Sequence, residues 1–252
     1  MIIKLFHKDE VYSPTQQIDE YTVLNVIGEG RYGICYLVCD NKKQYILKQL
    51  KKGMLKNNWT KADYEEKILT NVRHESIPGF IKKIENKKFF GYVLEYKEGK
   101  TFEELIFTEN YIWGRKEIYR IGIQIINILK YLHGKNIVHR DIRIPNTLYD
   151  GNRVNLIDFG LARWIDNKRY TVDVDFSYLG DFLLHLYYTS FEIKDNKKKA
   201  WYEELDLYRN ELLFLKRLMG IEERYKSIYD VERDFLKIRC TKLSSPIAGN
   251  LE

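Results

Sequence analysis

The sequence predicts an α+β fold with two lobes, a β-rich lobe over residues 1–96 and a mainly helical lobe over residues 97–252. Two observations give this division. Apolar and β-branched residues alternate through most of the first hundred positions, which is typical of strands. From about Thr101 onward, apolar residues instead recur with the 3.6-residue period of helices. A polar connector over Glu95–Gly99 separates the two patterns.

In the first lobe, strands are expected on both sides of one helix. Turn-forming runs at residues 40–43 and 86–88 indicate hairpins between neighbouring strands. The helix shows apolar residues at helical spacing over Ala62–Val72, after a capping-box-like start at Thr60-x-x-Asp63. The expected strands are Tyr21–Gly28, Ile34–Cys39, Gln44–Leu50, Phe80–Ile84 and Phe89–Glu95.

In the second lobe, the strongest helical signal is the apolar face of Arg115–Leu132, and Gly134 is expected to end this helix at the C′ position. Two short strands follow, at residues 147–149 and 154–156, with a turn at Asp150–Asn152 between them. The other expected helices are Phe102–Phe107, Asp175–Tyr188, Trp201–Met219 and Ile228–Ile238.

Composition is that of a globular protein, with 44% hydrophobic and 31% charged residues. No apolar run approaches the length of a membrane span, and the apolar N-terminal patch is too short for a signal peptide. The net charge of +6 comes from dispersed lysine runs without interleaved aromatic residues, which indicates solvated surface and not a nucleic-acid interface. Cys35 and Cys39 lie about 13 Å apart on one expected strand, too far for a disulfide. Together with the lone Cys240, they indicate reduced thiols and a cytoplasmic protein.

A glycine-rich run, containing Gly28, Glu29, Gly30 and Gly33, stands between two expected strands. A dinucleotide-binding turn would instead lead from a strand into a helix, whose N-terminus holds the pyrophosphate. A hairpin of glycines can fold its backbone N–H groups over a triphosphate. An ordinary glycine-rich turn remains the alternative for this pattern alone.

Lys48 stands in an apolar strand, where a lysine is rarely buried without a partner. Glu65 on the following helix is the expected partner. The alternative is a lysine on an edge strand whose ammonium group reaches water.

The loop after the long helix carries the groups that phosphoryl transfer requires. Asp141 can accept the proton of an attacking hydroxyl, and Arg143 can neutralise charge on a transferred phosphate. Asn146 and Asp158 offer the hard oxygen ligands that Mg²⁺ takes beside phosphates. His139 has no second His or Cys at metal spacing, so we expect it to pack and to form hydrogen bonds.

These motifs, in this order, resemble the Hanks-type protein kinases, the eukaryotic-like serine/threonine kinases of bacteria. The resemblance covers roughly Tyr21–Tyr188 and implies the bilobal kinase fold. It also implies transfer of phosphate from ATP, with Mg²⁺ or Mn²⁺, to serine and threonine hydroxyls of an unidentified protein substrate, autophosphorylation included. The motifs are Gly28-x-Gly30-x-x-Gly33, Lys48, Glu65-x-x-Ile68-Leu69, His139-Arg140-Asp141, Asn146 and Asp158-Phe159-Gly160.

The resemblance also implies a role for each matching residue. Lys48 would bind the α- and β-phosphates and pair with Glu65, and Asp141 would be the catalytic base. Asn146 and Asp158 would hold the metal. The remaining ATP contacts implied are the glycine loop (Gly28, Glu29, Gly30 and Gly33), Cys35, Ile46, the gatekeeper Leu94, the hinge (Glu95, Tyr96 and Lys97) and Leu148 below the adenine. Asp175 resembles the aspartate that ties down the catalytic loop in this family.

The sequence departs from the family after Asp158. Asp175 follows it by 17 positions, and no Ala-Pro-Glu motif lies between them. The activation segment is therefore expected to be short, with its usual platform for protein substrates absent or rebuilt. Tyr170 and Thr171 are the only phosphoacceptors in it. Arg143 replaces the common lysine, which preserves the charge but changes its geometry.

Two other functions fit parts of the pattern. A kinase-fold small-molecule phosphotransferase or ATPase, such as the small kinase-like subunit of the tRNA-threonylcarbamoylation machinery, also lacks Ala-Pro-Glu. Such relatives usually replace the arginine at position 140 with glycine and lose part of the glycine loop, and this chain has done neither. The other function is a nucleotide-binding scaffold, in which the branched side chain of Ile46 crowds the adenine.

Overall fold

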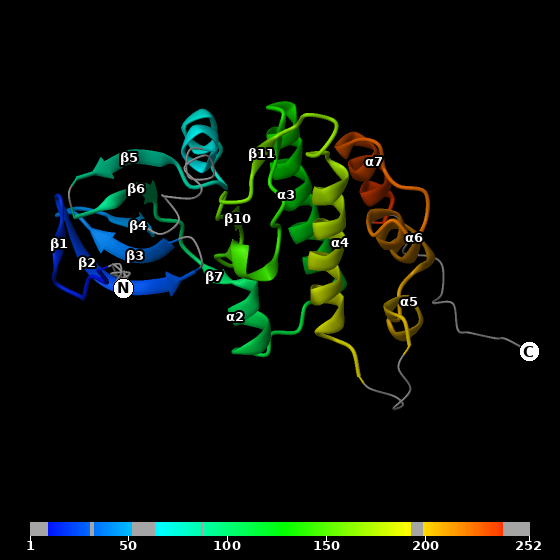
Figure 1. The fold of residues 1–252 in the computed structure, drawn as a ribbon. Helices are drawn as coiled ribbons and strands as arrows, with labels where there is room; N and C mark the ends of the chain where they lie inside the picture. The colour runs from blue at the N-terminus through cyan, green and yellow to red at the C-terminus, as the bar shows by residue number, and fades with distance from the viewer. Residues whose placement is uncertain (1–9, 31–32, 52–63, 87, 193–198, 239–252) are drawn as a thin grey trace, which may run out of the picture. The chain divides into compact units, whose positions relative to one another are not determined.

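The computed structural model describes residues 10–30, 33–51, 64–86, 88–192 and 199–238 (Figure 1). The chain divides into two compact units, residues 1–97 and residues 98–252. A large sheet occupies the first unit, and the second is mostly helical. The predicted α+β class is confirmed.

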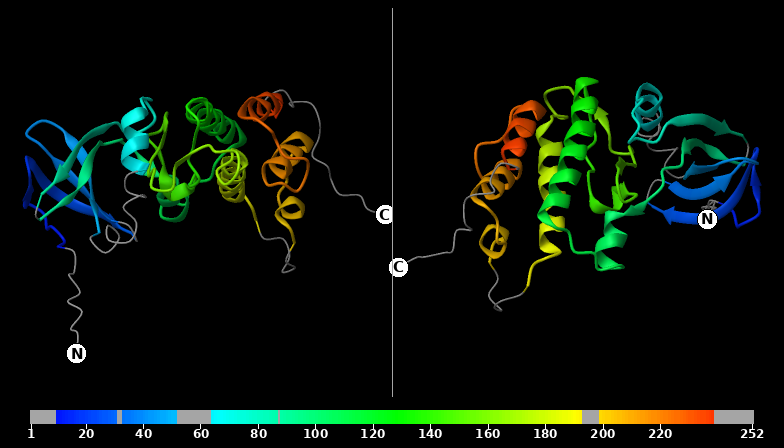
Figure 2. Two further views of the ribbon diagram at one scale, coloured as in Figure 1. Left: turned by 45° about the horizontal axis from the view of Figure 1, so that its top comes forward. Right: turned by 180° about the vertical axis from the view of Figure 1, so that it is seen from behind.

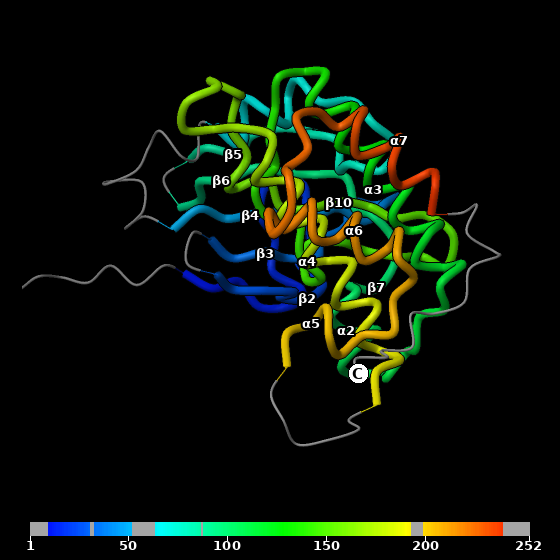
Figure 3. Tube along the Cα trace, turned by 90° about the vertical axis from the view of Figure 1, so that its right-hand side faces the viewer, coloured from blue at the N-terminus to red at the C-terminus, as the bar shows by residue number. Residues whose placement is uncertain are grey.

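The first unit is built on a six-stranded antiparallel sheet with the order β1-β2-β3-β4-β6-β5. Figure 3 shows β2, β3, β4, β6 and β5 side by side in this order. A helix covers residues 64–71, and its predicted start at Thr60–Asp63 lies outside the described residues. The strands are β1 (Gln17–Ile18), β2 (Tyr21–Glu29), β3 (Gly33–Cys39), β4 (Gln44–Leu50), β5 (Phe80–Glu85) and β6 (Phe90–Glu95).

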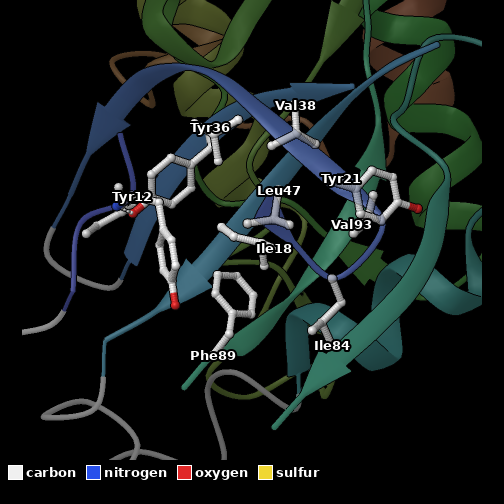
Figure 4. Packing of buried hydrophobic residues seen from close by; sticks show 11 residues of the cluster. Tyr12, Ile18, Tyr21, Tyr36, Val38, Leu47, Ile84, Phe89 and Val93 are labelled. Atoms are coloured by element: carbon white, nitrogen blue, oxygen red, sulfur yellow. Dashed lines mark hydrogen bonds between the residues drawn. The ribbon is translucent and has the colours of Figure 1, made fainter. Parts of the chain in front are cut away.

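One face of this sheet carries the core. Tyr36, Leu47 and Val93 lie opposite one another on neighbouring strands and are fully buried. The rings of Tyr12 and Phe89 pack edge-on, with centroids 6.0 Å apart, in the same cluster (Figure 4). Because successive side chains of a strand point to opposite faces, the residues between these core positions belong to the other face.

The second unit is organised around α3, which packs against α4 and α7. Both views in Figure 2 show α4 and α7 beside α3, and α6 beside α4. A side chain at Gly122 of α3 would lie 2.4 Å from the ring of Phe235 on α7, so this contact requires glycine. The helices are α2 (Phe102–Phe107), α3 (Arg115–Gly134), α4 (Asp173–Tyr188), α5 (Trp201–Glu204), α6 (Arg209–Leu218) and α7 (Ile228–Ile238).

Two small sheets frame the loops of the second unit. One has the order β10-β9-β7, and the other pairs β11 with β8. None of the helices in the described part of the chain is long and apolar enough to cross a membrane. The remaining elements are β7 (Lys100–Thr101), β8 (Ile137–Val138), the 3₁₀ turn η1 (Ile144–Asn146), β9 (Thr147–Tyr149), β10 (Val154–Leu156) and β11 (Arg163–Trp164).

The prediction of one helix over Trp201–Met219 is wrong. The chain leaves the helix at Leu205, where the backbone is extended, and a new helix begins after Tyr208. The break is held from outside, because the guanidinium group of Arg115 donates a hydrogen bond to the backbone oxygen of Asp206 and pairs with Glu211.

The predicted C′ role of Gly134 is also wrong. Gly134 is the last residue of α3, and the left-handed conformation falls on Asn136, with φ of 57°. Asparagine tolerates this region better than most residues with a side chain. Helix α4 begins at Asp173, before the predicted start at Asp175.

Candidate active site

Lys48 and Glu65 form a buried ion pair in the first unit. The ammonium nitrogen of Lys48 lies 2.8 Å from Oε1 and 2.9 Å from Oε2 of Glu65. The two residues are 9% and 4% exposed. Strand β4 lies between β3 and β6, so the alternative of a lysine on an edge strand is wrong. The pairing expected from the sequence is present, and the carboxylate holds the ammonium group in one place.

The glycine-rich run joins the antiparallel strands β2 and β3, and its residues 31–32 lie outside the described residues. Gly28 lies opposite Cys35, and the backbone N–H of Gly30 donates to the oxygen of Gly33 at 2.9 Å. A side chain at Gly33 would lie 2.3 Å from the backbone oxygen of Gln49, so this position requires glycine. Gly28 and Gly30 have open space around them, which leaves their backbone accessible. No helix follows the run, which excludes the strand-to-helix turn of dinucleotide-binding folds.

Three other residues predicted to contact ATP, Cys35, Ile46 and Leu94, share the sheet face opposite the core. Ile46 lies opposite Leu94, and Cys35 lies opposite Lys48. Ile27, just before Gly28, is 54% exposed although it is apolar. Ile27 was not expected at the site from the sequence, where the signal for it is its position directly before the first glycine of the run.

After β6, the chain is held by backbone and side-chain contacts. The backbone N–H of Glu95 donates to the oxygen of Gly79 at 2.8 Å. The ammonium group of Lys97 lies 2.9 Å from Oε2 of Glu95 and donates to the backbone oxygen of Glu75 at 2.8 Å. Tyr96 between them is half-buried. The predicted hinge therefore has a defined conformation in the first unit.

In the second unit, Asp175 holds the loop that follows β8. Its carboxylate is fully buried and accepts hydrogen bonds from the backbone nitrogens of His139, at 3.0 Å, and Arg140, at 2.7 Å. Arg140 has φ of 68°, which is uncommon for a residue with a side chain. The carboxylate thus stabilises a tight turn directly before Asp141, as the resemblance implied.

His133 at the end of α3 was not identified from the sequence. Its Nε2 lies 2.9 Å from Oδ2 of Asp175, and its side chain is buried. The contact joins α3, α4 and the loop, so it depends on residues that are 42 positions apart. No local sequence pattern reports such a contact.

The carboxylate of Asp141 accepts hydrogen bonds from two side chains. Arg143 donates from Nε at 2.5 Å and from a terminal nitrogen at 3.0 Å, and Asn146 donates from Nδ2 at 2.6 Å. The hydrogen bond to Asp141 raises the pKa of the Arg143 guanidinium above its ordinary value. The three residues form one group, with Asp141 nearly buried.

Asn146 and Asp158 lie at the open end of the β9–β10 hairpin. Leu156 pairs with Thr147, and the N–H of Ile157 donates to the backbone oxygen of Asn146 at 2.9 Å. Because the amide nitrogen of Asn146 is used by Asp141, its amide oxygen is left for other partners. The carboxylate of Asp158 is exposed and accepts the N–H of Gly160 at 3.2 Å.

This donor set fits Mg²⁺, which prefers hard oxygen ligands and takes most of its shell from water and substrate phosphates. Among the described residues, no group of three or more His, Cys, Asp or Glu side chains is placed to hold a metal. A closed, all-protein site of the zinc type is therefore absent from that part of the chain.

His139 is buried completely. Burial lowers the pKa of its imidazole although Asp175 nearby acts in the opposite direction. Its ring packs edge-on against Phe159, with centroids 4.6 Å apart. The packing expected from the sequence is present, but the expected side-chain hydrogen bonds are not, because neither ring nitrogen has a hydrogen-bond partner among the described residues. Leu148, also predicted to contact ATP, lies half-buried on β9 opposite Asn155.

Comparison with known proteins gives the same family. Residues 21–223 match the model of the protein kinase domain. The probable serine/threonine-protein kinase YbdM of Bacillus subtilis (strain 168) is 35% identical over 226 residues, which are 85% of this chain and 88% of the relative. Serine/threonine-protein kinase nekl-2 of Caenorhabditis elegans is 30% identical over 167 residues, 60% of this chain and 46% of the relative. This chain belongs to the protein kinase family, as a serine/threonine kinase of the Hanks type.

Proposed function

We propose that the chain transfers the γ-phosphoryl group of ATP to serine and threonine hydroxyls of proteins, with Asp141 as the base. The observation that carries this assignment is the 2.6 Å hydrogen bond between Asp141 and Asn146. It places a proton-accepting carboxylate beside a side chain whose free oxygen suits a metal. Phosphoryl transfer requires this proximity, because its catalysis consists mainly of positioning and charge neutralisation.

In the proposed reaction, Asp141 accepts the proton of the substrate hydroxyl while the hydroxyl oxygen attacks the γ-phosphorus. The new oxygen–phosphorus bond forms as the bond to the bridging oxygen breaks, and ADP leaves with that electron pair. Arg143 holds the carboxylate of Asp141 in place through two hydrogen bonds. A divalent cation, Mg²⁺ or Mn²⁺, held by Asn146 and Asp158 would neutralise charge on the phosphates.

The first unit supplies the proposed nucleotide contacts except Leu148, which belongs to the second unit. Lys48 would bind the α- and β-phosphates, and Glu65 keeps its ammonium group in position. The backbone of the glycine hairpin would cover the phosphates. The proposed adenine contacts are Cys35, Ile46, Leu94 and Leu148, with Ile27 added from its exposure, and the hinge is Glu95, Tyr96 and Lys97.

The proposed substrate is a protein, because the relatives found are serine/threonine-protein kinases. No observation on the described residues favours a small-molecule phosphotransferase. The thiols of Cys35 and Cys39 form no disulfide in the described chain, which fits action in a reducing compartment such as the cytoplasm.

The test is transfer from γ-labelled ATP to the chain itself and to generic protein acceptors, with Mg²⁺ or Mn²⁺. Asp141→Asn is expected to lower transfer about 10²- to 10⁴-fold, the usual contribution of a general base. Asp181→Asn, on the exposed side of α4, is the matched control and is expected to behave as wild type. Labelled serine or threonine should appear only where Asp141 is intact.

A second readout separates binding from chemistry. ATP with Mg²⁺ should raise the melting temperature of both wild type and Asp141→Asn, because a bound ligand stabilises the folded state. Asp158→Asn should abolish the part of this shift that depends on Mg²⁺. Absence of transfer by wild type to every acceptor, with either metal, would refute the proposal.

A further inference from the structure

In the segment after Gly160, the side chain of Asp166 holds residues 166–170 in a turn. Oδ1 of Asp166 accepts the backbone N–H groups of Lys168, at 2.9 Å, Arg169, at 2.8 Å, and Tyr170, at 2.8 Å. These hydrogen bonds lower the pKa of Asp166. The N–H of Asp166 donates back to the oxygen of Tyr170 at 3.2 Å, which closes a compact turn.

The turn is fixed to the loop that carries Asp141. Strand β11 pairs with β8, and the N–H of Ile165 donates to the oxygen of Asn136 at 2.7 Å. Tyr170 is therefore connected to the end of β8 through β11 and through the turn that Asp166 holds.

Tyr170 presents its ring to Arg140. The guanidinium carbon of Arg140 lies 4.8 Å from the ring centroid, within the range of a cation–π interaction. The same guanidinium group donates to the backbone oxygen of Leu161 at 3.1 Å. The side chain of Arg140 thus contacts the segment after Gly160 at two points.

The backbone conformation of Arg140 needs support from its surroundings. Its φ of 68° is unfavourable for a residue with a side chain, and such conformations persist where surrounding contacts enforce them. Asp175 holds its backbone, while Tyr170 and Leu161 hold its side chain. Asp141 follows directly, so the direction of its carboxylate depends on this turn.

We propose that Tyr170 is a positioning residue for Asp141, acting through its aromatic ring on Arg140 and without phosphorylation of the segment. This inference rests on the proposed role of Asp141 as the base. The ring and not the hydroxyl is the active part, because the contact with the guanidinium group is made by the ring. The loop of Asp141 is then ordered by this contact in the unmodified chain.

Two substitutions at this position separate the ring from the hydroxyl. Tyr170→Leu removes the aromatic face but keeps an apolar side chain, and it is expected to lower kcat about three- to tenfold with the KM for ATP within twofold. Tyr170→Phe keeps the ring and removes the phosphoacceptor, and it is expected to retain wild-type kcat within twofold. Thr171→Ala, which removes the other phosphoacceptor, should also retain it.

Arg169 provides the matched control. Its guanidinium group lies 5.4 Å from the centroid of the same ring, but Arg169 belongs to the turn and not to the loop of Asp141. Arg169→Leu therefore removes one cation from Tyr170 without touching Arg140, and kcat should stay within twofold of wild type. Tyr170→Leu should add little to Arg140→Leu in the double variant, because both remove the same contact.

Hydrogen–deuterium exchange supplies a readout that needs no activity. In Tyr170→Leu, the amides of His139 and Arg140 should exchange faster than in wild type, while Tyr170→Phe should match wild type. An inactive wild type with this exchange pattern would refute the proposed function and leave the positioning role standing. Unchanged kcat and unchanged exchange in Tyr170→Leu would overturn the inference. Equal impairment of Tyr170→Phe and Tyr170→Leu would overturn it too, because the hydroxyl would then be responsible.

Discussion

Oδ1 of Asp175 lies 2.7 Å from the backbone nitrogen of Arg140, a residue 35 positions earlier in the chain. The other oxygen of the same carboxylate accepts from His139 and contacts the imidazole of His133. One fully buried carboxylate in the first turns of α4 thereby joins the end of α3 to the loop of Asp141.

Asp175→Asn should impair both stability and catalysis. The amide keeps one acceptor oxygen, but its NH₂ group would face backbone N–H donors and leave at least one of them unsatisfied. We expect the free energy of unfolding to fall by about 1–3 kcal/mol and kcat to fall at least about tenfold. Urea unfolding and phosphate transfer measure the two effects. Asp181→Asn on the same helix should change unfolding by less than about 0.5 kcal/mol.

Lys48→Met should abolish activity and destabilise the first unit. Because Glu65 would remain buried without its cation, we expect a loss of about 3–5 kcal/mol in unfolding free energy, the usual cost of breaking a buried pair. Lys83→Met is the control. Lys83 on β5 lies 3.3 Å from Glu66, which is next to Glu65 on the same helix, but the side chains of Lys83 and Glu66 are both about 30% exposed. It should cost at most about 1 kcal/mol. Equal losses in the two variants would contradict the buried character of the Lys48 pair.

Alanine should have opposite effects at two glycines of α3. At Gly122 the new methyl group would lie 2.4 Å from the ring of Phe235, so overpacking should destabilise the chain by about 1–3 kcal/mol. At Gly134 the new methyl group would meet no atom within 4 Å beyond its chain neighbours and its own helix backbone, so alanine should stabilise the last helical turn by about 0.5–1 kcal/mol. Thermal unfolding of the two variants measures the change in stability, which should be negative for Gly122→Ala and positive for Gly134→Ala. A stabilised Gly122→Ala would show that α3 and α7 do not pack closely.

Stability should decrease in mild acid because of His139. Burial lowers the pKa of its imidazole in the folded state, so the unfolded state binds the proton more readily. The contribution of His139 is therefore complete above the unfolded pKa of about 6.5 and is lost as the pH falls toward the lower folded value. His139→Phe keeps an aromatic ring beside Phe159 and should flatten the dependence of unfolding free energy on pH between 7 and 5. An identical slope in wild type and variant would contradict this assignment.

The strands of the first unit could be predicted because each signal is local. Alternation identified β2, β3, β4 and β6 to within a few residues, since one face of the sheet must be apolar. The pairing of Lys48 with Glu65 was also predictable, because a lysine in an apolar strand requires a counter-charge. β1 was missed, since a two-residue strand carries no period.

The features that escaped prediction depend on contacts between distant residues. The break between α5 and α6 contains neither proline nor glycine, and it is stabilised by Arg115, about 90 positions earlier. Helix α3 ends later than predicted because Asn136 and not Gly134 takes the left-handed conformation. In the candidate site, Asp141 and Asn146 were predicted from the sequence and lie within hydrogen-bond distance, whereas the positive φ of Arg140 and its contact with Tyr170 follow from tertiary structure.

In residues 98–252, the hairpin that carries Asn146 and the turn before Asp141 are held by contacts of different sequence separation. Asn146 and Ile157 are joined within one short hairpin, whereas the turn before Asp141 requires α4 to be in place. A short loop closes at a lower entropic cost than a long one, so the end proposed to hold the metal is the more autonomous of the two. If the proposed roles hold, a single substitution in α4 would remove catalysis from a lineage and leave the proposed nucleotide and metal contacts in place. Evolution from an enzyme to a binding protein would then need no change in any residue proposed to contact ATP.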